Sequence, residues 1–84
     1  MSIWVVYFDT EPSVMYFRNA KRAYDYMKNT LIDYISNCNE WGDRERVYYY
    51  EKELEELERE YGIITEDDLS FGANVVWARK EEVY

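Results

Sequence analysis

The densest concentration of ionisable side chains in the sequence lies between residues 51 and 68. In this segment nine residues are acidic and only two, Lys52 and Arg59, are basic. The acidic residues are Glu51, Glu53, Glu55, Glu56, Glu58, Glu60, Glu66, Asp67 and Asp68. The rest of the chain has nine acids and eight bases, so nearly all of the net charge of −8 belongs to this acidic segment. Such carboxylates can bind metal ions, take part in catalysis or form an anionic docking surface.

Metal binding and carboxylate catalysis do not fit the spacing of these acids. A calcium loop has oxygen ligands at alternate positions around a central glycine, whereas Glu66, Asp67 and Asp68 are consecutive. We interpret them as capping residues of a short helical turn, because acids are favourable at a helix N-terminus. Glycoside hydrolysis needs two opposed carboxyl groups in a concave pocket, for which 84 residues leave little room. We therefore expect no metal and no other cofactor.

Other catalytic arrangements lack their usual residues. The sequence has no histidine and one cysteine, Cys38, which excludes a histidine general base, a His-centred triad and a Cys/His zinc site. It also has no glycine-rich phosphate loop and no nucleophile elbow. Cys38 is in register with the apolar face of a predicted helix, where we expect it to be buried. The sequence therefore predicts a protein that is not an enzyme.

Length and composition predict one folded unit. The 84 residues are 48% hydrophobic and 19% aromatic, which is typical of a folding chain, and we expect a single small acidic α+β domain over residues 1–84. No apolar stretch approaches the roughly 18 residues of a membrane span, and the first residues do not resemble a secretory signal. Together with the unpaired cysteine, these features predict a cytoplasmic protein without membrane contact.

Three segments have the composition of β-strands. Residues 3–8 are rich in β-branched and aromatic side chains, and turn-forming residues follow at 9–13. Residues 14–17 come next at hairpin distance, so we expect the two segments to pair across a five-residue loop. Residues 73–79 contain a further apolar run and predict a last strand beside the first.

Two amphipathic helices are predicted between the second and third strands. After the N-cap Asn19, residues on one face recur at steps of three and four: Ala20, Ala23, Tyr24, Met27, Leu31, Tyr34, Ile35 and Cys38. The pattern breaks at residues 37–42, Asp43 caps a second helix, and Gly62 is the expected left-handed residue after its end. The second helix has a narrower apolar face: Val47, Tyr50, Leu54, Leu57 and Tyr61. Residues 65–68 then predict a short capped turn that ends near residue 72.

These elements predict an α+β fold in the order β-β-α-α-β. Two antiparallel helices pack on one face of a three-stranded, mostly antiparallel sheet. The first strand has large apolar side chains on both faces: Ile3, Val5 and Tyr7 on one, Trp4, Val6 and Phe8 on the other. Because the helices cover only one face, we expect a homodimer or a protein partner to cover the other, unless the C-terminal tail or the loop after Gly62 does so.

Three consecutive tyrosines lie near the start of the second helix. Successive helical positions differ by about 100°, so Tyr48, Tyr49 and Tyr50 cannot share one narrow face. We expect at least one to be exposed, and tyrosine is enriched in binding hot spots. We therefore consider Tyr48 and Tyr49 candidate anchors for a partner.

The acidic segment has two interpretations. The simpler one is a solvated helix face that keeps the protein soluble. The functional interpretation is an anionic ridge that binds a basic protein surface. Like charges four residues apart, as in Glu51 and Glu55, oppose helix stability, so helix stability alone does not account for their presence. The net negative charge makes direct binding to nucleic acid unfavourable.

In its size, tyrosine content and glutamate-rich helix, the chain resembles small phage-encoded accessory proteins, including inhibitors of host defence nucleases that imitate DNA. This resemblance implies an anti-defence role. Our first hypothesis is a non-catalytic inhibitor that presents its acidic helix to a basic surface of a nucleic-acid-handling protein. The expected binding residues are Glu51, Glu53, Glu55, Glu56, Glu58, Glu60, Tyr48 and Tyr49. The alternative is a structural or assembly module that dimerises through the open aromatic face of the sheet.

Overall fold

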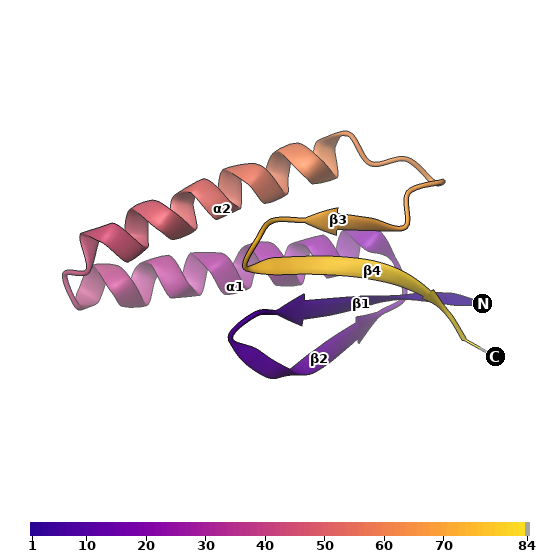
Figure 1. Cartoon of the computed structure of the whole chain (residues 1–84), viewed down its shortest axis with the longest axis horizontal. Helices are drawn as coiled ribbons and strands as arrows, with labels where there is room; N and C mark the ends of the chain where they lie inside the picture. Colours follow the sequence, from indigo (N-terminus) through magenta and orange to yellow (C-terminus); the bar gives the residue numbers. More distant parts are fainter. Residues whose placement is uncertain (84) are drawn as a thin grey trace.

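The computed structural model describes residues 1–83, in which two antiparallel helices lie over a four-stranded antiparallel sheet (Figure 1). The elements are β1 (Ser2–Phe8), β2 (Glu11–Phe17), α1 (Ala20–Glu40), α2 (Arg44–Gly62), β3 (Ser70–Gly72) and β4 (Val76–Glu82). The strand order is β2-β1-β4-β3, so the first and last strands are central neighbours, as predicted. The α+β class is confirmed, whereas the predicted number of three strands is wrong.

The β1–β2 hairpin is tighter than predicted. Phe8 pairs with Glu11, so Asp9 and Thr10 form the connection in place of a five-residue loop. Pro12 consequently lies inside β2. β2 is an edge strand, so one of its sides has no neighbouring strand. The Pro12 nitrogen, which has no N–H to donate, can face that side without loss of a hydrogen bond in the sheet.

The strand that the sequence did not reveal is β3. It has only three residues and pairs with β4 through Phe71 and Ala78. A hydrogen-bonded turn is present at residues 65–68, but it is not helical as predicted: the backbone N–H of Thr65 donates to the Asp68 carboxylate at 2.7 Å, and the Asp68 N–H donates to the Thr65 carbonyl oxygen at 3.1 Å. This turn leads into a strand instead of ending near Gly72. β4 begins and ends three residues later than predicted.

Both helices begin at the predicted caps. The side chain of Asn19 accepts a hydrogen bond from the backbone N–H of Arg22 at 2.9 Å, and that of Asp43 accepts one from Arg46 at 3.1 Å. Each cap satisfies a backbone donor that has no partner within the helix. These local bonds explain why both starting points could be predicted from the sequence.

The helix ends differ from the prediction. α1 continues to Glu40, past the predicted break, and the chain reverses at Gly42, whose φ of +73° is in the left-handed region. Gly62 was expected to have that conformation but is the last residue of α2 and has no positive φ. α2 instead ends in tighter bonds, from the N–H of Ile63 to Glu60 and of Ile64 to Tyr61.

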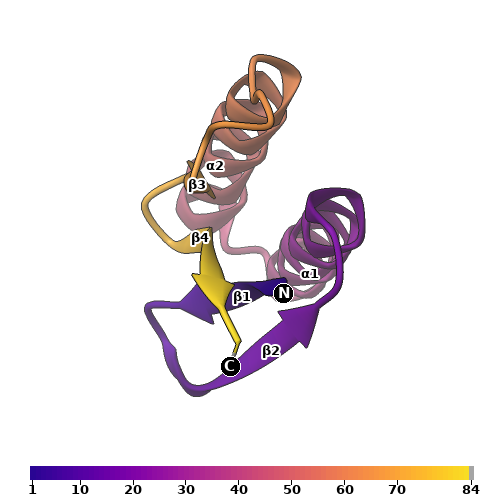
Figure 2. The same cartoon turned by 90° about the vertical axis from the view of Figure 1, so that its right-hand side faces the viewer.

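The hydrophobic core lies between the helices and one face of the sheet (Figure 2). The helices cover the face of β1 that bears Trp4, Val6 and Phe8. The buried residues of this core are Trp4, Val6, Phe8, Ala23, Met27, Leu31, Leu57, Phe71, Val75, Val76 and Ala78. Cys38 is also buried, as expected.

No helix or loop of residues 1–83 covers the other face of the sheet, but the side chains of that face leave Val5 only 1% exposed. The C-terminal segment continues as β4 in the plane of the sheet, and the loop after Gly62 runs from the end of α2 to β3, on the helix side (Figures 1 and 2). The expectation that one of these segments covers the face is therefore wrong.

Candidate protein-binding surface

The outer side of α2 has a row of exposed residues at helical spacing. Tyr48, Glu51, Glu55 and Glu58 follow one another at steps of three, four and three, which places them on one face of the helix. We call these four residues the acidic stripe. Tyr48 is 63% exposed. Neither Glu51 nor Glu55 forms an ion pair with another residue in the 1–83 range, so both carboxylates are available to a partner.

Glu53 points into the molecule and is not part of this surface. It is 4% exposed, and its carboxylate accepts hydrogen bonds from the backbone N–H groups of Asn74 at 3.2 Å and Val75 at 3.0 Å. It therefore connects α2 to the turn between β3 and β4. In this position Glu53 has almost no exposed surface with which to contact a partner.

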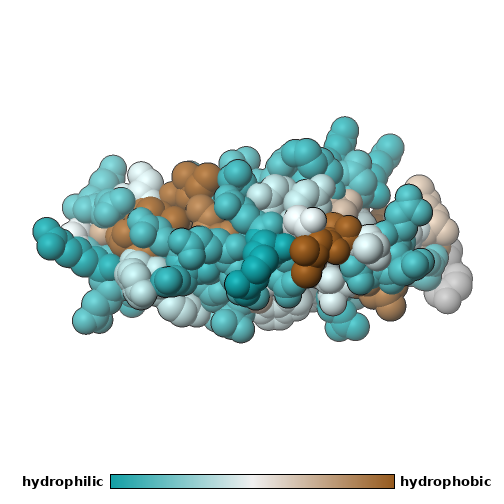
Figure 3. All heavy atoms as spheres, turned by 90° about the horizontal axis from the view of Figure 1, so that it is seen from above, coloured by the Kyte–Doolittle hydropathy of each residue, from teal (hydrophilic) through white to brown (hydrophobic). Residues whose placement is uncertain are grey.

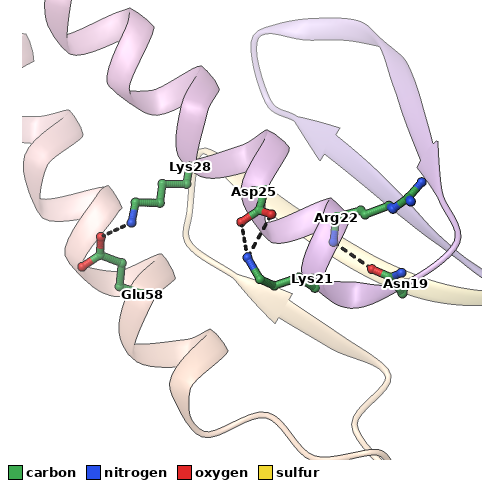
Figure 4. Close-up of polar contacts among 6 residues, drawn as sticks. All are labelled: Asn19, Lys21, Arg22, Asp25, Lys28 and Glu58. Carbon is green, nitrogen blue, oxygen red and sulfur yellow. Dashed lines mark hydrogen bonds and ion pairs between the residues drawn. The ribbon is translucent and has the colours of Figure 1, made fainter.

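Two of the other predicted glutamates have basic neighbours within the chain. The guanidinium of Arg59 donates to Glu56, and Lys28 Nζ lies 3.5 Å from Glu58 Oε1 (Figure 4). Exposed pairs of this kind contribute only about 0–1 kcal/mol and remain open to competition from a stronger partner. Glu60 is half-buried. The acidic surface is thus narrower than the sequence predicted.

The basic residues at the start of α1 are also partly neutralised (Figure 4). Lys21 Nζ lies 2.8 Å from an oxygen of Asp25, one helical turn further on. Lys28 reaches across to α2. Lys21 and Lys28 therefore pair with acids, whereas Arg18 and Arg22 form no ion pair within residues 1–83.

An aliphatic seam runs beside the acidic stripe, along the line where the helices meet. The contact between Lys28 and Glu58 indicates the register of the antiparallel pair, in which Ile32 of α1 lies across from Leu54 of α2. The seam consists of Ile32, Ile35, Val47 and Leu54. Ile32 is 43% exposed and the others are half-buried. Figure 3 shows apolar atoms gathered over the helices within a largely polar surface.

The three tyrosines of α2 have different environments. Tyr50 is half-buried, with its ring centroid 5.4 Å from that of Tyr34, while Tyr48 and Tyr49 are exposed. The prediction of at least one exposed tyrosine is confirmed. Partial desolvation and the nearby Glu53 carboxylate raise the pKa of Tyr49.

An exposed aromatic residue that the sequence analysis did not identify is Trp41. It lies after the last residue of α1, at the tip of the helical hairpin that extends beyond the sheet (Figure 1), and is 78% exposed. The sequence position of Trp41, between a helix and Gly42, could have indicated its exposure. A large aromatic side chain in a tight connection is too far from the core to be buried in it. Trp41 is a second aromatic anchor candidate beside Tyr48.

Tyr34 connects α1 to the β1–β2 hairpin and gives a testable pH dependence. Its hydroxyl donates to Glu11 Oε1 at 3.0 Å, and burial together with this bond raises the pKa of Tyr34 to about 12. The unfolded value is about 10. The neutral hydroxyl therefore adds stability that is complete below pH 10 and is lost as the pH rises through about 12.

We predict that Tyr34→Phe reduces the loss of stability in this alkaline range, as measured by urea unfolding at a series of pH values. Tyr48→Phe is the control, because the Tyr48 hydroxyl has no hydrogen bond to any residue from 1 to 83. Identical pH profiles for the two variants would contradict the assignment.

Two open hollows lie on the surface formed by residues 1–83, and the smaller, of about 340 Å³, is lined by Tyr49, Lys52, Glu53, Glu55, Glu56, Arg59 and Asn74. The larger of these two, of about 560 Å³, is lined by Trp4, Ala20, Tyr61, Ile64, Thr65, Glu66, Asp67 and Lys80. Among residues 1–83, no three His, Cys, Asp or Glu side chains lie close enough together to hold a metal ion. No helix of that range has the length and apolar character needed to cross a membrane. Comparison of the chain with protein families, with curated proteins and with solved structures finds no match.

Proposed function

We propose that this protein is a non-catalytic binding module that presents the outer face of its helical hairpin to a basic surface of a nucleic-acid-handling protein. The observation that carries the proposal is the position of the acidic stripe beside the aliphatic seam. Protein interfaces commonly combine an apolar centre with a polar rim, and here the rim is negative. The matching surface has an apolar strip with Lys or Arg along its border.

The charge distribution supports this choice of partner. Glu51 and Glu55 are exposed, and the exposed acids at 66–68 extend the negative charge beyond the end of α2. A helix rises about 1.5 Å per residue, so these two glutamates are about 6 Å apart along the axis, whereas phosphates of one DNA strand are about 3.4 Å apart. The stripe is thus less charged than DNA. Electrostatic attraction would accelerate association, and the seam and Tyr48 would supply the apolar contact.

An inhibitor of a nuclease, such as a phage-type anti-defence protein, is the most specific form of the proposal. The cleft of such an enzyme carries cations that bind phosphates, and a row of carboxylates can compete for them. The small size and the acidic, tyrosine-rich composition support this form.

The test is to reverse the charge of the stripe. We predict that Glu51→Lys, Glu55→Lys and Glu58→Lys, combined in one variant, weaken binding about 10- to 100-fold and flatten its salt dependence. The partner is first captured from a host lysate at two salt concentrations and then titrated by biolayer interferometry.

The matched control reverses three exposed acids elsewhere: Glu40→Lys, Glu45→Lys and Glu82→Lys. Both variants have the same net charge, so a general electrostatic effect would weaken the binding of both equally. If the partner contacts the acidic stripe itself, only the stripe variant binds more weakly. Unchanged affinity of the stripe variant would exclude this surface from the mechanism.

A further inference from the structure

The face of the sheet opposite the helices has a defined set of side chains. In the strand register, every second residue of β1 lies beside a residue of β4 on this face: Ile3 beside Glu81, Val5 beside Arg79 and Tyr7 beside Trp77. Tyr16 of β2 lies on the other side of Val5. We call this set the open face: Ile3, Val5, Tyr7, Tyr16, Trp77, Arg79 and Glu81. Figure 2 shows both helices on the other side of the sheet.

Contacts within the open face hold its side chains in place. The rings of Tyr7 and Trp77, which are direct partners in the register, stack at 5.9 Å with an angle of 13°. The Tyr7 hydroxyl donates to Glu81 Oε1 at 2.9 Å. Tyr16 is 63% exposed. A surface whose aromatic side chains are already ordered loses less conformational entropy on binding.

The charge of the open face identifies its occupant. Arg79 and Glu81 are its two charged residues, and their signs are opposite, so this face is nearly neutral on a chain of charge −8. Neither forms an ion pair within the described chain. A uniformly basic or acidic partner would match one of the two and oppose the other. The same face of a second copy matches both.

We propose that the protein forms a homodimer through the open face, with Arg79 of each copy against Glu81 of the other. The two sheets face each other, and a two-fold axis lies between them, parallel to the sheets and perpendicular to the strands. The axis passes over β4 between Arg79 and Glu81, so it produces both contacts at once. Val5, the register partner of Arg79, is only 1% exposed, so the apolar part of the interface comes from the side chains around it: Ile3, Tyr7, Tyr16 and Trp77. The interface then has an apolar contact flanked by reciprocal ion pairs.

This arrangement leaves the two acidic stripes on opposite outer sides of the dimer, because the helices lie away from the open face (Figure 2). The dimer therefore does not depend on the proposed partner, and the variants that test it leave the stripe unchanged.

The test measures dimerisation of the full chain by sedimentation velocity over a range of concentrations. Arg79→Glu and Glu81→Arg each place like charges together, and each should lower the association constant about tenfold or more. The double variant, with both substitutions, restores opposite charges across the axis and should recover the dimer. Both residues are exposed, so circular dichroism should show an unchanged fold.

A second pair of variants tests the face independently of the ion pairs. Tyr16→Glu introduces a charge into the open face and should produce a monomer, whereas Ile63→Glu, at a side chain of similar exposure after the end of α2, should leave the dimer intact. A wild-type monomer at all concentrations would overturn the proposal. A dimer that tolerates Tyr16→Glu, or a double variant that does not recover, would overturn it as well.

Discussion

Replacing Gly72 with alanine is expected to destabilise the fold by about 2–4 kcal/mol. Gly72 ends β3 with a φ of +148°, a conformation that residues with a side chain rarely adopt. A Cβ at this position would lie 2.5 Å from the Cα of Trp77 and 2.7 Å from the carbonyl oxygen of Val76. Both are backbone atoms of β4 and cannot rotate aside as a flexible side chain can. Alanine therefore forces β3 away from β4.

The measurement is urea unfolding of the three glycine variants together. Gly62→Ala meets no atom within 4 Å and lies in a helix, where alanine is favoured by up to about 1 kcal/mol. Gly42→Ala also has open space, but its φ of +73° makes alanine cost about 1–2 kcal/mol. The expected order of stability is Gly62→Ala, then Gly42→Ala, then Gly72→Ala. Equal stability of the Gly62 and Gly72 variants would contradict this account of the β3–β4 contact.

The elements with a strong repeating pattern were predictable from the sequence. Met27 and Leu31 of α1 and Leu57 of α2 recur at helical spacing and are fully buried. β3 was not predictable, because three residues show no alternation and contain one large apolar side chain, Phe71. Its position depends on tertiary contacts: the Phe71 ring lies 5.3 Å from that of Trp4 and 5.5 Å from that of Tyr61.

The two glycines near the helix ends, Gly42 and Gly62, show why local rules did not determine where the helices end. Both Gly42 and Gly62 fit the pattern of a left-handed residue after a helix. After Gly42 the chain must reverse at once, because α2 begins at Arg44, and the left-handed conformation provides that reversal. After Gly62 a longer loop leads to β3, so no sharp reversal is required. The difference arises from the packing of the elements on each side.

The candidate surface was only partly predictable for a similar reason. The sequence located the acidic segment and predicted an exposed tyrosine, but Glu53 was predicted to face a partner together with the other glutamates. Glu53 lies four residues before Leu57 and is on the buried side of α2. The partner of Glu53 was not predictable, because the donors are backbone N–H groups of a turn more than 20 residues away.

Glu53→Ala is therefore expected to lower the free energy of unfolding by about 2–4 kcal/mol, although glutamate is usually a surface residue. The substitution leaves the N–H groups of Asn74 and Val75 without their acceptor in a partly buried turn. Glu53→Gln keeps one acceptor oxygen and loses the charge, so its stability should lie between those of the alanine variant and the wild type. Urea unfolding gives the free energies, and hydrogen exchange of the Val75 amide should become faster in the alanine variant.

Glu55→Ala, two residues further along α2, is the matched control because Glu55 is exposed and has no ion pair within residues 1–83. Its stability should remain within about 0.5 kcal/mol of the wild type. Binding to a basic partner should show the reverse dependence: Glu55→Ala weakens it, whereas Glu53→Gln has little effect while the domain remains folded. If Glu55→Ala destabilised the domain as much as Glu53→Ala, the inward and outward glutamates of α2 would not have the separate roles that their contacts assign to them.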